Sequence, residues 1–395
     1  MRKGVWRRET VMMLSALLVG MAGTLRPAAA AEQDGAAGAA EPDAAAQAAM
    51  RKGLDWLENK LNEDGSWSNR NYPAMTALGL WAFARSDHPQ REAVCAKAAS
   101  FIEGFVREDG GIYKPATGGR GTGGLSTYNT AICMIALHTY DRARYAQQIL
   151  KAREFLAGSQ LVGDSSGAGG FGYDRAPPAD AAGKSMRRSR ADLSNTGWAL
   201  QAMRVTQDLE DLRPGGETVD MDWPAAVEFL ETLQNNDRDD PEHYGGFGYE
   251  QGGSRGGTFV RETDGTVQLR GYGSMTYAGL ESMIYAQVDR TDPRVRSALQ
   301  WAERHWSVDE NPGMGQKGLF YYFNILSKAL SLYGADTLRS PGGEVIPWKE
   351  QLIGKLSAIQ RADGSWVNQD NQFWEADPVL VTSYAILSLE YALGI

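Results

Sequence analysis

The carboxylates best placed for chemistry in this 395-residue chain stand just before apolar helical segments. Asp192 stands four residues before Thr196 of one such segment, and Glu375 and Asp377 precede the last segment. A carboxyl group that faces a desolvated cavity has a raised pKa and can act as a general acid. Carboxylates also favour helix starts because they cap free N–H groups. Both roles remain open, and we take Asp192, Glu375 and Asp377 as candidate catalytic residues.

Basic and aromatic residues near the same segments suggest a ligand. Arg187 and Arg188 lie between Lys184 and Arg190, just before Asp192. Such a cluster could hold a diphosphate or another anion, although a solvated basic loop has the same composition. Aromatic residues that face a cavity would line an apolar pocket and could stabilise carbocations, whereas others would fill the core. The candidate ligand-binding residues are Tyr128, Trp198, Tyr272, Tyr322, Asn324, Trp374, Arg187 and Arg188.

A repeat positions these residues. Six segments join a small or hydroxyl residue to a helical apolar stripe with few charges, which is typical of buried helices; they are 75–83, 129–137, 195–203, 275–283, 322–330 and 381–389. Threonine takes the same place in five of them. An amphipathic helix precedes each one, as expected for an outer helix with one solvated face; these helices are 44–61, 91–106, 145–159, 223–235, 293–305 and 348–359.

Glycine-rich turns separate the two helices of each pair. Residues Gln360 to Trp366 read Q-x-x-x-G-x-W, and weaker copies lie near Gly65, Gly110, Gly169 and Gly245. A motif repeating every several tens of residues indicates an array of one structural unit. We therefore predict an all-α protein, an (α/α)6 toroid of six helical hairpins with an inner and an outer ring. The long loops 107–125, 160–192, 236–271 and 334–347 are expected at the cavity mouth.

This pattern resembles the prenyltransferase/squalene-oxidase repeat superfamily, above all the C-terminal domain of squalene–hopene cyclases, over residues 47–395. The resemblance implies the toroid and an apolar or isoprenoid-like ligand in its central cavity. Squalene cyclases protonate their substrate with an Asp of a D-x-D-D-T-A motif, but the comparable positions here read Asp192-Leu193-Ser194-Asn195-Thr196. Protein prenyltransferases bind zinc through Asp, Cys and His, and this chain has no Asp-x-Cys. We expect no metal and no cofactor.

The N-terminus predicts export. A basic stretch with Arg7 and Arg8 precedes an apolar run from Val11 to Leu25 and a small-residue cleavage site, which is typical of a signal peptide. We expect a signal peptide over residues 1–31, an Ala/Gly-rich linker over 32–46, and a periplasmic or secreted protein. Cys95 and Cys133 lie on apolar helical faces, which favours free thiols over a disulfide.

Composition excludes some functions and leaves three open. The net charge of −9 argues against nucleic-acid binding, and no apolar run after residue 25 is long enough to span a membrane. The first hypothesis is an exported enzyme or carrier that binds an isoprenoid-like ligand in the toroid cavity. The second is a non-catalytic binding or scaffold protein. The third is an (α/α)6 glycan lyase or hydrolase with a carboxylate pair from Asp192, Glu375 and Asp377.

Overall fold

The computed structural model describes residues 33–118, 123–163, 167–175, 190–261 and 264–395. The predicted signal peptide and the candidate ligand-binding residues Arg187 and Arg188 lie outside the described residues. The chain divides into two compact units, 1–40 and 41–395. Helix α1 (Gln33–Lys60) includes residues 33–46, where composition predicts a linker. Alanine, which is frequent in this stretch, has the highest helix propensity of all residues.

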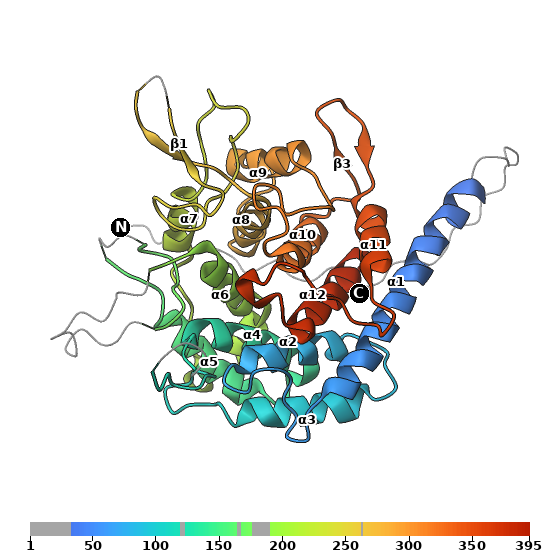
Figure 1. The fold of residues 1–395 in the computed structure, drawn as a ribbon. Coiled ribbons are helices and arrows are strands. Elements are labelled where there is room, and N and C mark those ends of the chain that lie inside the picture. Colours follow the sequence, from blue (N-terminus) through green and yellow to red (C-terminus); the bar gives the residue numbers. More distant parts are fainter. Residues whose placement is uncertain (1–32, 119–122, 164–166, 176–189, 262–263) are drawn as a thin grey trace, which may run out of the picture. The chain divides into compact units, whose positions relative to one another are not determined.

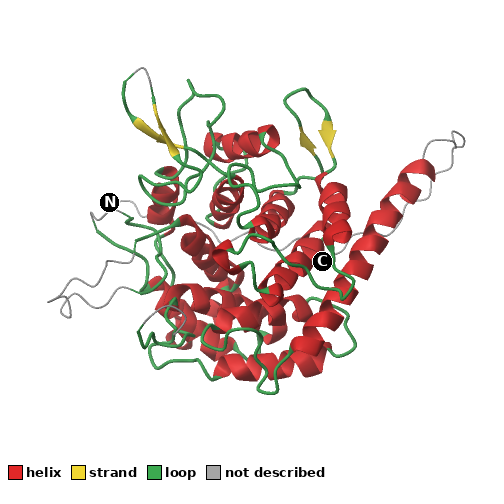
Figure 2. Cartoon of the chain, in the orientation of Figure 1, coloured by secondary structure: helices red, strands yellow, loops and turns green. Residues whose placement is uncertain are grey.

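Residues 41–395 form paired helices, which confirms the predicted all-α fold class (Figures 1 and 2). The inner helices are α2 (Pro73–Ala84), α4 (Ser126–Asp141), α6 (Leu193–Val205), α8 (Gly273–Tyr285), α10 (Leu319–Tyr333) and α12 (Pro378–Leu393). The outer helices are α1, α3 (Arg91–Glu103), α5 (Ala146–Ala157), α7 (Trp223–Glu231), α9 (Pro293–Arg304) and α11 (Trp348–Ile359). Each inner helix packs against the next, and α12 packs against α2, so the inner ring is closed.

One backbone hydrogen bond recurs in five hairpins and ties each turn to its inner helix. The residue two places after the repeat glycine donates its N–H to the repeat threonine hydroxyl at 2.9 to 3.1 Å. The pairs are Trp67–Thr76, Ile112–Thr130, Phe171–Thr196, Phe247–Thr276 and Trp366–Thr382. In the remaining hairpin Phe323 takes the threonine position. The conserved spacing of the repeat therefore sets where each turn meets its helix.

The repeat glycines join each hairpin to the next outer helix. They are Gly65, Gly110, Gly169, Gly245 and Gly364, with φ between +84° and +91°. An added Cβ at any of them would come within 1.9 to 2.4 Å of a backbone carbonyl oxygen in the following outer helix. For Gly364 that oxygen belongs to Lys52 of α1, and Gln360 donates to the Ala49 carbonyl of α1 at 2.9 Å. The last motif thus closes the outer ring onto the first helix.

Two β-hairpins decorate the long loops. Strands β1 (Thr258–Val260) and β2 (Val267–Leu269) pair antiparallel, with Thr258 opposite Leu269. Strands β3 (Leu338–Arg339) and β4 (Val345–Ile346) pair likewise, with Leu338 opposite Ile346. The described residues also form 3₁₀ segments at Gln207–Leu212, Pro214–Gly216 and Gln372–Trp374.

The glycine contacts generate a stability prediction. We expect Gly364→Ala to lower the free energy of unfolding by roughly 2 to 4 kcal/mol, because the methyl group would meet the Lys52 carbonyl and the positive φ is unfavourable for alanine. Gly354→Ala is the matched control, since its Cβ would meet open space on α11; it should stabilise by about 0.5 to 1 kcal/mol. Urea denaturation of both variants measures the difference. Equal effects would contradict the closure role of Gly364.

Candidate functional site

A cavity of about 800 Å³ opens where the inner helices begin. All six inner helices contribute residues from their first turns or the residue just before them. The wall contains seven tyrosines: Tyr72, Tyr128, Tyr173, Tyr249, Tyr272, Tyr321 and Tyr384. Met75, Leu78, Met275, Met314 and Leu380 add apolar surface. Of the described residues in this wall, Arg255 alone is charged, and none is an Asp, Glu, His or Lys.

Backbone strain gathers at this cavity. Five non-glycine residues of the described chain have positive φ, and three of them line the wall: Leu125 (+55°), Phe373 (+55°) and Trp374 (+68°). Bulky residues adopt this region only at a free-energy cost, and such strain persists where the surrounding structure imposes it, often at binding sites. The strained pair places Trp374 edge-on against Tyr72, with ring centroids 4.7 Å apart. Phe373 and Trp374 are partly exposed to solvent, at 40% and 44%.

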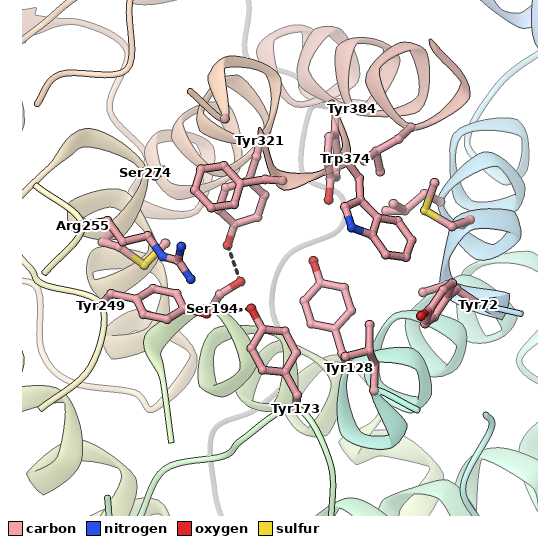
Figure 3. Close-up of a pocket in the computed structure, with 18 of the residues that line it drawn as sticks. Tyr72, Tyr128, Tyr173, Ser194, Tyr249, Arg255, Ser274, Tyr321, Trp374 and Tyr384 are labelled. Carbon is pink, nitrogen blue, oxygen red and sulfur yellow. Dashed lines mark hydrogen bonds between the residues drawn. The ribbon is translucent and has the colours of Figure 1, made fainter. Parts of the chain in front are cut away.

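One side of the cavity is polar. The hydroxyl groups of Tyr173 and Tyr249 are hydrogen-bonded at 2.7 Å, and the guanidinium of Arg255 lies 4.2 Å from the centroid of the Tyr249 ring. Ser194 and Tyr321 form a second hydroxyl pair at 3.0 Å (Figure 3). Burial and the nearby charge of Asp192 raise the pKa of Tyr249 well above its usual range. These hydroxyls therefore face the cavity as neutral hydrogen-bonding groups.

Asp192 lies behind this polar side and outside the cavity wall. It is 2% exposed and is the N-cap of α6, where its carboxylate accepts from the backbone and side-chain nitrogens of Asn195 at 2.9 and 2.7 Å. Burial raises its pKa to about 7, although hydrogen bonds from Asn195 and Tyr249 oppose the shift. The residue of this segment that reaches the cavity is Ser194. The segment comparable to the D-x-D-D motif thus presents a hydroxyl to the ligand space.

Glu375 and Asp377 also cap the N-termini of helices. Glu375 accepts from the backbone N–H groups of Tyr321 (2.7 Å) and Phe320 (3.3 Å), so it caps α10, and burial raises its pKa to about 7. Asp377 is the N-cap of α12 and accepts from Val379 at 2.9 Å. Neither carboxylate lines the cavity. The three candidate acids are brought to the same end of the ring, but each one satisfies backbone donors.

Capping by side chains extends to all six inner helices. At the N-termini of α2, α4 and α8, a backbone N–H group donates to a side-chain oxygen of the next hairpin, with N···O distances of 2.7 to 3.0 Å. The acceptors are Asn129 for α2, Asp174 for α4 and Asn311 for α8. The first N–H groups of a helix have no partner within it and must be satisfied when they are buried. Because every inner helix begins at the cavity end, the ring needs six such acceptors there. Polar residues in these positions therefore have a structural function.

Three candidate ligand residues line the cavity and three do not. Tyr128, Tyr272 and Trp374 belong to the wall. Tyr322 is fully buried and donates to the Ser307 carbonyl at 2.8 Å, away from the cavity. Trp198 and Asn324 are buried outside the wall, four residues after Ser194 and three residues after Tyr321 on the same helices. Helical periodicity alone does not separate a residue at cavity depth from one below it.

Below the cavity, a buried ionic cluster fills the ring. Lys328 donates to Gln201 at 2.7 Å, lies 3.3 Å from a Glu281 carboxylate oxygen, and sits 4.2 Å from the Trp198 ring centroid. Both side chains of this ion pair are 2% exposed or less. A second pair joins Arg85 to Glu390 at 3.2 Å. Removing either cation leaves a buried carboxyl group without its partner, and removing either carboxyl group leaves a buried cation without one.

Sequence reasoning missed Tyr173, Tyr249 and Arg255. The two tyrosines hold the same place in the repeated stretches Gly-Gly-Phe-Gly-Tyr at 169–173 and 245–249, so their equivalence was a usable signal. Arg255 carried no signal, because it lies in a glycine-rich loop. Loop 334–347, expected at the mouth, contributes nothing to the wall because it follows the C-terminal end of α10.

Other expectations concern cysteines, metals and membranes. Cys95 and Cys133 are both free and buried, and burial raises the pKa of the Cys95 thiol to about 12. In the described part of the chain, no three His, Cys, Asp or Glu side chains gather as a metal site would require. Among the same residues, no helix is long and apolar enough to cross a membrane.

Comparison with known proteins places the fold. No family model and no curated protein matches the chain. The type II terpene cyclase MstE from Scytonema superposes with a TM-score of 0.56 and 13% identity, covering 89% of this chain and 99% of that one. Its complex with geranylgeranyl dihydroxybenzoate gives 0.54 over 90% and 99%. A glycosidase gives 0.51 at 13% identity, over 89% and 98%. At such identities the likeness establishes a shared helical toroid and nothing about chemistry.

The buried carboxyl group of Glu390 generates a pH prediction. Burial raises the pKa of Glu390 from 4.5 to about 8, and Arg85 offsets only part of the shift. A group whose pKa is raised by folding contributes stability that is full below its unfolded pKa and is lost as pH rises through its folded pKa. The free energy of unfolding of the wild type, relative to Glu390→Gln, should therefore fall on the order of 3 kcal/mol between pH 5 and pH 8. Chemical denaturation across this range measures it, and a difference that stays constant with pH refutes the assignment.

Proposed function

We propose that this toroid binds an apolar or amphipathic, isoprenoid-like ligand in its central cavity. One observation carries the proposal: the ring leaves a hollow of about 800 Å³ unfilled, with a wall of aromatic rings, methionines and leucines. The cavity is open to solvent at its mouth, so a ligand that covers its apolar wall would displace water and gain the free energy of apolar burial. Its volume lies within the range of about 300 to 1,000 Å³ that holds small-molecule ligands.

The strained rim supports the same proposal. Phe373 and Trp374 keep large exposed rings at the mouth despite an unfavourable backbone conformation. The superposable MstE structure contains a geranylgeranyl compound, and this chain shares the toroid in which such a ligand fits. Binding is therefore the activity that the wall supports best.

The wall favours binding over two kinds of catalysis. Proton-initiated cyclisation needs a strong acid that touches the substrate. In this segment the described wall contains Ser194, whereas Asp192 lies outside the wall and accepts a hydrogen bond from the Asn195 side chain. Hydrolysis by a carboxylate pair needs two carboxylates facing one cleft, roughly 5 to 10 Å apart. Asp192, Glu375 and Asp377 are instead engaged with backbone N–H groups of three helices. The glycosidase likeness adds the fold alone.

We also propose export to the periplasm or the exterior, from the basic and apolar N-terminal stretch. Mass spectrometry of the protein recovered from cell fractions tests this. A mature chain that begins near residue 32 and is absent from the cytoplasm is expected, and a full-length cytoplasmic chain contradicts it.

Binding is tested with geranylgeraniol as the ligand. Wild-type protein should bind it in equilibrium dialysis, and native mass spectrometry should find apolar ligands that co-purify. Leu78→Trp should weaken binding at least about tenfold, because the larger side chain projects into the cavity.

Leu212→Trp is the matched control, since Leu212 is 54% exposed on an outer 3₁₀ segment. It should bind geranylgeraniol as the wild type does. Failure of the wild type to bind, or equal weakening in both variants, would reject the cavity as the ligand site.

A further inference from the structure

Arg255 stands at the mouth of the cavity between two aromatic rings. Its guanidinium lies 4.2 Å from the ring centroid of Tyr249 and 4.9 Å from that of Phe373. Stacking of this kind holds the planar group in a defined orientation while leaving its edge free to donate hydrogen bonds. Figure 3 shows Arg255 and Tyr249 together on one side, opposite Tyr72 and Trp374.

Within the described residues, Arg255 has no ion-pair partner. The groups around it are mainly tyrosines, namely Tyr249, Tyr272 and Tyr173. Burial raises the pKa of Asp192, which lies behind the wall, and the charge of Arg255 opposes this shift, but the two side chains do not form an ion pair. The nearby Arg261, by contrast, pairs with Asp237 at 2.6 Å and with Asp264 at 3.0 Å. A cation that faces the cavity and makes no direct ion pair with a protein carboxylate is suited to an anion from the ligand.

The cavity is polarised along one direction. Arg255 and the paired hydroxyls of Tyr173 and Tyr249 form the polar side. Met75 and Leu78 belong to α2, and Tyr72, the N-cap of α2, lies across the cavity from Arg255 and Tyr249 in Figure 3. An amphipathic molecule therefore has one preferred orientation, with its head toward Arg255 and its chain toward α2.

The charges around the cavity limit which polar head group the ligand can carry. A diphosphate carries two to three negative charges and usually meets several cations. The described wall offers one arginine, and the negative charge of Asp192 lies behind it. A carboxylate matches one guanidinium through two parallel hydrogen bonds.

We propose that the ligand of the central cavity is an apolar-chain carboxylic acid whose carboxylate binds Arg255 beside the hydroxyls of Tyr173 and Tyr249. This inference rests on the proposed function of the cavity as an apolar ligand site and specifies the class of that ligand. No covalent step is involved.

The test compares geranylgeranoic acid with geranylgeraniol and geranylgeranyl diphosphate in equilibrium dialysis at pH 8 and low salt. Wild-type protein should bind the acid at least about tenfold more tightly than the alcohol, because a charge-assisted bond replaces a neutral one. The diphosphate should bind less tightly than the acid.

Variants locate the preference. In Arg255→Gln the ratio of acid to alcohol affinity should fall to about one, and in Arg255→Lys it should fall partially because lysine offers no planar fork. Arg270→Gln is the matched control: Arg270 lies 5.8 Å from the Phe259 ring on the neighbouring hairpin, outside the wall, and its loss should leave the ratio unchanged. Thermal unfolding of each variant shows that the fold is retained.

The outcomes separate this inference from the function on which it rests. If the alcohol binds and the acid binds no better, or if the ratio survives in Arg255→Gln, the carboxylate assignment is refuted and the apolar cavity stands. A diphosphate that binds most tightly also refutes it. If neither acid nor alcohol binds, the proposed function fails, and the ligand class fails with it.

Discussion

The structure depends on one recurring contact, the approach of a glycine turn to the backbone of the next outer helix. At Gly65, Gly110, Gly169, Gly245 and Gly364 any side chain would collide with a carbonyl oxygen of that helix. The adjoining N–H-to-threonine bond fixes the same turn to its own inner helix. Together they set the spacing between neighbouring hairpins. Because the contact made by Gly364 falls on α1, the array ends as a closed ring.

Closing the ring brings six helix starts to one end and creates a demand for hydrogen-bond acceptors. Asn129, Asp174, Asn311 and Glu375 serve neighbouring helices, and Asp192 and Asp377 serve their own. These residues surround the cavity, but their acceptor atoms point into the helix starts. The described wall contains hydroxyl groups, aromatic rings, methionines, leucines, two asparagines and one arginine. Such a wall suits recognition of a ligand better than acid catalysis.

The ring is filled unevenly along its axis. Its lower half holds the buried Glu281–Lys328 and Arg85–Glu390 pairs together with Trp198, and its upper half stays hollow. Buried ion pairs add little net stability but penalise rearrangement, because each charge needs its partner. Strain at Phe373 and Trp374 occurs at the mouth, where both side chains are partly exposed.

The sequence by itself determined the all-α class, the six hairpins and the division into inner and outer helices, because these follow from local apolar periodicity and from a motif that recurs at regular spacing. It also located Tyr128, Tyr272 and Trp374 near the cavity end. Only the tertiary structure decided that Asp192, Glu375 and Asp377 act as caps, since the direction of a carboxylate depends on which helix start lies beside it. The tertiary structure likewise placed Trp198 and Asn324 below the cavity and brought Arg255 to its mouth. Depth along the ring axis and the path of a glycine-rich loop are set by contacts between distant segments, which a local pattern does not encode.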